Sequence, residues 1–152
     1  MSKRRHLTVN FAAAAYRLYT WSRHVLQWTR PLWRWLGDGR SERVLLAVEK
    51  PVKGLMFDCQ MCGQCILNQT GLSCPMNCPK SLRNGPCGGV RANGHCEVDP
   101  SMRCVWVEAW RGAQLSGREF ALRQVQAPVN HARRGRSSWM SVVHESSESS
   151  GS

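Results

Sequence analysis

Between residues 10 and 27, apolar side chains recur every three or four positions, and arginines occupy positions between them. This spacing predicts an amphipathic α-helix, because residues that far apart share one face of a helix. The alanines at 12–15 favour helix, and Asn10 is a suitable N-cap. Pro31 is expected to end or kink this helix, and the apolar run at 32–36 predicts a short second one.

The pattern is less regular in the rest of the chain. Residues 41–48 fit a helical turn or a strand equally well. From 59 to 104, frequent glycine and proline predict loops and turns with at most a helical turn or a short hairpin. Helical spacing returns over 105–123, and Pro128 marks the end of that segment. About half of residues 137–152 are serine, a composition typical of a disordered tail.

Tryptophan is concentrated near the N-terminus. Trp21, Trp28, Trp33 and Trp35 lie within 15 residues, more than a small free-standing helix can bury. Three interpretations remain open: the side chains pack on the rest of the chain, dock on a partner, or lie at a membrane surface.

Positive charge is concentrated in the same region. The net charge is +11, and residues 1–50 carry ten Lys/Arg against three Asp/Glu. A solvated basic face, an acidic protein partner, nucleic acid and an anionic membrane are all compatible with this charge. We expect no nucleic-acid partner, because the charge lies away from the cysteine-rich segment at 59–104 and no zinc-finger recognition helix is evident.

The location of the protein follows from two further observations. No run of 18 predominantly apolar, uncharged residues exists, so we expect no transmembrane segment. Arg17, Arg23 and His24 interrupt the apolar stretch that a signal peptide would need. We therefore expect a cytoplasmic protein, in which structural disulfides are rare and thiols are available to metals.

Every cysteine lies in one segment. The eight are Cys59, Cys62, Cys65, Cys74, Cys78, Cys87, Cys96 and Cys104. Eight thiolates suffice for two four-cysteine metal sites. Two successive C-x-x-C steps favour a [4Fe–4S] cluster, because short gaps let sulfurs converge while backbone N–H groups point inward. The later C-x3-C-P sequence matches the end of the bacterial ferredoxin pattern, and zinc is the alternative because it accepts the same thiolates.

The assignment of cysteines to sites is partly open. Cys59, Cys62 and Cys65 are expected to share one site with either Cys74 or Cys78. The other four, including the last three in the chain, would form the second. His95 is interpreted as a surface loop residue, although it could serve as a ligand. Three cations, Lys80, Arg83 and Arg91, are expected to bind an anion, face a partner or be solvated.

These observations divide the chain into five parts. They are a basic disordered N-terminus (1–9), a Trp/Arg-rich helical arm (10–48), a cysteine-rich metal-binding module (49–111), a C-terminal helix (112–127) and a disordered tail (128–152). The expected fold class is a small irregular metal-stapled module, with loops, short helices and little strand, flanked by α-helices. The sequence contains no P-loop, G-x-S-x-G or G-x-G-x-x-G motif, so we do not expect the chain to be catalytic alone.

The cysteine-rich segment resembles a known family. The sequences FDCQMCGQC, CPMNCPK, NGPCGG and CVWVEAW are similar to the methylenetetrahydrofolate reductase C-terminal-like family over roughly Val48 to Arg111. That module occurs fused to, or beside, a flavin-containing reductase barrel.

The resemblance implies an accessory role in one-carbon and folate metabolism. The partner would be a separate flavin-containing methylenetetrahydrofolate reductase catalytic subunit, to which this chain would relay electrons or which it would brace. All eight cysteines fit the family's pattern, so a metal role is implied for each. The flavin- and folate-binding barrel is absent from this sequence, so no catalytic residue carries over.

Overall fold

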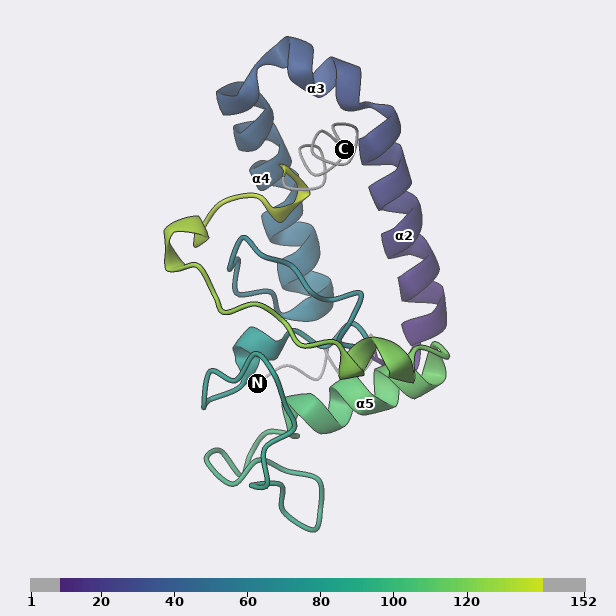
Figure 1. Ribbon diagram of the computed structural model, residues 1–152, viewed down its shortest axis with the longest axis vertical. Coiled ribbons are helices and arrows are strands. Elements are labelled where there is room, and N and C mark those ends of the chain that lie inside the picture. The colour runs from purple at the N-terminus through teal and green to yellow at the C-terminus, as the bar shows by residue number, and fades with distance from the viewer. Residues whose placement is uncertain (1–8, 141–152) are drawn as a thin grey trace.

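The computed structural model describes residues 9–140. Figure 1 shows two upright helices, α2 and α4, joined at one end by α3, while α5 crosses the opposite end. The α-helices are α2 (Ala12–Trp28), α3 (Arg30–Leu36), α4 (Asp38–Phe57) and α5 (Val105–Leu115). The 3-10 helices are η1 (Pro75–Asn77), η2 (Glu119–Arg123) and η3 (His131–Arg133). Within the described residues, strand pairing is limited to two isolated bridges, so the expectation of helices and little strand is confirmed.

The helix α2 forms where the periodicity predicts it, and its two faces have different environments. The buried face consists of Ala12, Ala15, Tyr19 and Leu26. The outer face exposes 63% of Trp21 and 84% of Trp28, and 81% of Trp35 in α3 is exposed as well. Packing inside this chain therefore does not explain these three tryptophans. No described helix is long and apolar enough to cross a membrane.

The helix α4 is longer than the sequence pattern suggests. It runs through Pro51 without a break, and it includes residues 41–48, for which helix and strand had been equally plausible. One face buries a side chain at every fourth residue: Ser41, Leu45, Glu49, Lys53 and Phe57. Because that face packs along its whole length, the hydrogen bond that a proline removes does not end the helix. The helix ends at Asp58, whose φ of 53° is left-handed.

Loops and the C-terminal segment fill the space between α2 and α4. Near α5, side chains from both helices form a buried cluster with the cysteine-rich loop, namely Ala15, Tyr19, Phe57, Leu67, Leu72 and Cys74. Near α3, Leu26 and Leu45 pack with Met140 and the partly buried Trp33 and Trp139. The cysteine-rich loop is thus held between two helices that precede it in the chain.

Residues 130–140, which we name the strap, lie in the part of the chain that was expected to be a disordered tail. Gly135 N–H donates to the carbonyl of Met61 over 2.8 Å, and Asn130 N–H donates to Gln64 Oε1 over 2.6 Å. The strap then continues to the buried Ser137 and Ser138. Its contacts hold it across the first cysteine loop and against α4. Residues 1–8 and 141–152, also expected to be disordered, lie outside the described residues.

Candidate metal centre

Four of the eight cysteines line one small cavity. They are Cys59, Cys62, Cys65 and Cys74, which we name the first group. The cavity has a volume of about 20 Å³, enough for an atom the size of a water molecule. Its wall also includes Arg136 and Ser138 of the strap. Of the two candidates for the fourth member of this group, the structure therefore places Cys74, and not Cys78, at the cavity.

Two thiols of the first group interact directly. A hydrogen bond from Cys59 lowers the pKa of Cys74, and the backbone N–H groups of Gln60 and Met76 lower it further. The pKa of Cys59 is raised by the same hydrogen bond and by burial. Met61 N–H also points to Cys59 Sγ at 3.4 Å. The local environment therefore favours a thiolate at Cys74, the form that binds metals.

A buried ion pair lies beside the first group. Lys53 Nζ is 2.7 Å from Glu49 Oε1, and both side chains are only 1% exposed. Burial lowers the pKa of Lys53, but the negative charges of Cys65 and Glu49 outweigh it, so the pKa lies above its usual value. Lys53 thus places a fixed positive charge where several thiolates would gather.

The ion pair also fastens the strap to α4. Lys53 Nζ donates to Ser138 Oγ over 2.7 Å, and the hydroxyls of Ser137 and Ser138 both donate to the Glu49 carboxylate. Burial raises the pKa of Glu49, but the Lys53 charge and these hydrogen bonds bring it below its usual value. The carboxylate therefore remains charged in the core, with its oxygens occupied by donors.

Tyr19 connects α2 to the first group. Its hydroxyl is 3.6 Å from Cys65 Sγ, within hydrogen-bond distance for sulfur. Burial and the nearby Cys65 raise the pKa of Tyr19, so the phenol keeps its proton and acts as a donor. Hydrogen bonds of this kind stabilise a metal-bound thiolate.

Three of the other four cysteines lie around the N-terminal end of α5. Cys78, Cys96 and Cys104 share a buried cluster with Met102 and Trp106. Two bridges, Val90 with Cys96 and His95 with Arg103, fold the loop back on itself. Cys104 immediately precedes α5. We name Cys78, Cys96, Cys104 and Cys87 the second group. Cys87 is included because its charge, like that of Cys96, acts on Lys80.

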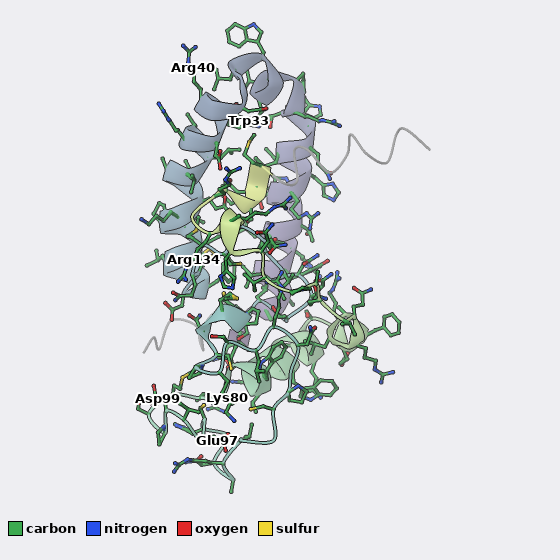
Figure 2. All side chains as sticks on the ribbon, turned by 60° about the vertical axis from the view of Figure 1, so that its left-hand side comes forward. Trp33, Arg40, Lys80, Glu97, Asp99 and Arg134 are labelled. Carbon is green, nitrogen blue, oxygen red and sulfur yellow. The ribbon has the colours of Figure 1, made fainter. Side chains whose placement is uncertain are left out.

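Charge and hydrogen bonding near the second group differ from those near the first. Lys80 pairs with Glu97 on the surface, as Figure 2 shows at the lower end of the molecule. The hydrogen bond to Glu97 raises the pKa of Lys80, and the charges of Cys87 and Cys96 contribute in the same direction. His95 Nδ1 lies 2.8 Å from the carbonyl of Pro100 in the loop, in agreement with its interpretation as a loop residue.

The donor set fits a metal, although the side chains are not arranged as ligands. Among residues 9–140, no three His, Cys, Asp or Glu side chains are positioned to hold one ion. Each group nevertheless contains four sulfur donors, the set used by four-cysteine zinc sites and by [4Fe–4S] clusters. The residues present therefore suit either metal in number and in chemistry.

Several residues around the first group were not predicted as part of the site. Lys53 and Glu49 lie four residues apart, a spacing that indicates an ion pair on a helix, but Pro51 between them is a helix-breaking residue. Ser137 and Ser138 belong to a serine-rich segment whose composition indicates disorder. Tyr19 lies at a core position of an amphipathic helix, and nothing in its spacing indicates a cysteine partner.

Comparison with known proteins identifies the family. Residues 39–132 match the family described as "Methylene-tetrahydrofolate reductase C terminal". No curated protein and no solved structure matches the chain. The match begins at the start of α4, so it contains all eight cysteines and the Lys53–Glu49 pair but not α2. Because more than half of the chain is matched, this protein belongs to the methylene-tetrahydrofolate reductase C-terminal family.

Proposed function

We propose that this chain is a metal-cluster accessory subunit of a methylenetetrahydrofolate reductase-type complex in one-carbon and folate metabolism. It holds iron–sulfur clusters through its eight cysteines, and it acts in the cytoplasm. A separate flavin-containing subunit catalyses the reduction, and this chain relays electrons to that subunit or braces it.

One observation carries the proposal: four of the eight cysteines line one cavity, and three of the other four share a buried cluster. Around the first group, backbone N–H groups, the Tyr19 hydroxyl and the Lys53 ammonium supply hydrogen bonds or positive charge. Four thiolates around a metal leave net negative charge, and such donors stabilise it. A bound iron–sulfur cluster supplies one-electron transfer, while the residues of this chain bind it, shield it and set its electrostatic environment.

The exposed tryptophans support a protein partner. Leu18, Trp21, Val25 and Trp28 recur every three or four residues on the outer face of α2, and Trp35 in α3 is exposed as well. Tryptophan and arginine are the residue types enriched at protein interfaces. We name the exposed Trp21, Trp28 and Trp35 the tryptophan stripe and assign it to the reductase subunit.

The test is a reconstitution with the flavin-containing methylenetetrahydrofolate reductase of the same organism. We expect the two proteins to co-elute in gel filtration under anaerobic conditions. If electrons are relayed, the reduced chain bleaches the visible absorbance of the reductase flavin; if the role is bracing, the complex only raises the melting temperature of the reductase. The proposal is wrong if there is no complex and neither the flavin absorbance nor the melting temperature changes.

A structural zinc module is the second candidate, because four sulfur donors per group fit zinc equally well. In this case the chain would be colourless, and it would bind its partner without passing electrons. Zinc and iron contents distinguish the two candidates directly.

A further inference from the structure

Arg83 is a buried cation with unused donors. Its side chain is 8% exposed, and Nη2 donates to the carbonyl of Gln64 over 2.9 Å. Nε and Nη1 are buried and have no hydrogen-bond partner among the residues that the structure describes. A guanidinium keeps its charge, and buried charges in proteins are normally paired and hydrogen-bonded. Arg83 therefore lacks the anion that its environment requires.

Arg83 also lines a cavity of about 610 Å³. Its volume lies within the range of small-molecule binding sites. His131 and Arg134 of the strap lie on its wall, and Ser81 contributes a hydroxyl. Among the described residues that line it, none carries a carboxylate. Figure 2 shows Arg134 midway along the molecule, away from the Lys80–Glu97 pair.

The cavity also reaches the first group of cysteines. Cys62, Met76 and Arg83 line both this cavity and the small one that the four cysteines surround. A ligand held by Arg83 and Arg134 would therefore lie beside Cys62. Lys80 and Arg91 do not share this position, since both interact with Glu97 at the surface.

We propose that the cavity between Arg83 and Arg134 binds an oxyanion, the phosphate or carboxylate group of a small molecule. Arg83 would contribute its charge and one N–H donor, from Nε or Nη1, because these two groups point in different directions and do not grip one oxyanion together. Arg134 and His131 would close the site from the strap. The proposal goes beyond the accessory role, since it requires neither a particular metal nor the reductase.

The experiment is calorimetric titration of the full-length, anaerobically purified chain at constant ionic strength. Inorganic phosphate, pyrophosphate and glutarate are the probes, so the phosphate and carboxylate arms are separated. We expect one saturable site for at least one probe. Arg83→Met and Arg134→Gln should each weaken binding about tenfold or more, as expected for loss of a charge-assisted hydrogen bond. Arg43→Met, on an exposed position of α4, is the matched control and should bind as the wild type does.

Three outcomes would overturn the proposal. The first is no saturable binding of any probe by the wild-type chain. The second is an equal loss in Arg43→Met and Arg134→Gln, which would indicate general charge attraction. The third is that the wild type binds no anion while Arg83→Met has an altered metal content or visible spectrum. This result would show that Arg83 balances the charge of the cysteine thiolates. If circular dichroism shows Arg83→Met to be unfolded, Arg134→Gln decides, because that side chain is exposed.

Discussion

At the scale of single residues, Lys53 is a buried cation with several specific partners. Its ammonium is buried with Glu49, donates to Ser138, and lies 5.2 Å from the centroid of the Trp139 ring. The contacts with Ser138 and Trp139 join α4 to the strap. The same ammonium is close enough to Cys65 for the thiolate charge to raise its pKa. Lys53 therefore both holds the strap on α4 and places a positive charge near Cys65.

Removal of this charge should destabilise the fold. Lys53→Met leaves the Glu49 carboxylate buried and unpaired, which costs about 3–5 kcal/mol of unfolding free energy. The double variant Glu49→Gln with Lys53→Met leaves no buried charge and should lose clearly less. Denaturant unfolding of the three proteins measures both differences. Equal losses in the single and double variants would show that Lys53 contributes through packing and not through charge.

The division of the cysteines predicts how metal is lost. Cys74→Ser should remove the metal of the first group and Cys87→Ser that of the second, so each variant keeps about half of the wild-type metal. The two substitutions together should remove all of it. Met76→Leu, which lines the first cavity without a thiol, is the control and should keep its metal. If the double variant retains as much metal as either single one, the eight cysteines do not form two independent sites.

Sequence alone identified all eight cysteines as candidate ligands, because thiol spacing is a local property. It did not identify the buried pair or the burial of Arg83, which depend on contacts across the fold. Lys53 and Ser138 are 85 residues apart, and Arg83 reaches Gln64 across 19 residues. The sequence does not show whether a cation is solvated or buried. Its environment is known only once the residues packed around it are known.

At the scale of elements, α2 combines two roles on opposite faces. Tyr19 and Leu26 pack inward, while the tryptophan stripe faces solvent. Deletion of the arm would therefore remove part of the core as well as the proposed interface. Point substitutions on the outer face separate these effects.

We expect Trp21→Ser, Trp28→Ser and Trp35→Ser in combination to weaken binding of the reductase subunit at least about tenfold, because tryptophans at an interface carry much of the binding energy. Their exposure predicts little change in melting temperature. Phe120→Ser, an exposed aromatic in η2, is the matched control. Sedimentation of the mixed proteins measures the affinity. If the triple variant binds the reductase subunit with wild-type affinity, the tryptophan stripe is not part of the interface.

The elements that could be predicted are those with a local signal. The periodicity around residues 10–27 predicted α2. The helical spacing over 105–123 predicted α5, which ends at Leu115 and is followed by the 3-10 helix η2. The full length of α4 could not be predicted, because Pro51 is a helix breaker unless the surrounding face is packed. The strap could not be predicted either, since its stability comes from Glu49 and from the loop at Met61 and Gln64.

At the scale of the whole molecule, the family region supplies all eight cysteines, and segments outside it help to enclose the first group. Residues 39–132 carry the family pattern and both cysteine groups. Before it, α2 adds Ala15 and Tyr19 to the buried cluster beside the first group, and after it the strap continues from η3 to Met140 (Figure 1). The first group is therefore enclosed by elements from both sides of the family region, while the second group is built within it.

The central claim is that this chain holds iron–sulfur clusters on its cysteines. Anaerobic purification, followed by iron, sulfide and zinc analysis and a visible spectrum, tests it most directly. The account predicts a brown protein with about four or eight irons and matching sulfide per chain. A colourless protein with stoichiometric zinc, and no iron even after reconstitution, would contradict the electron-transfer role and leave a structural subunit.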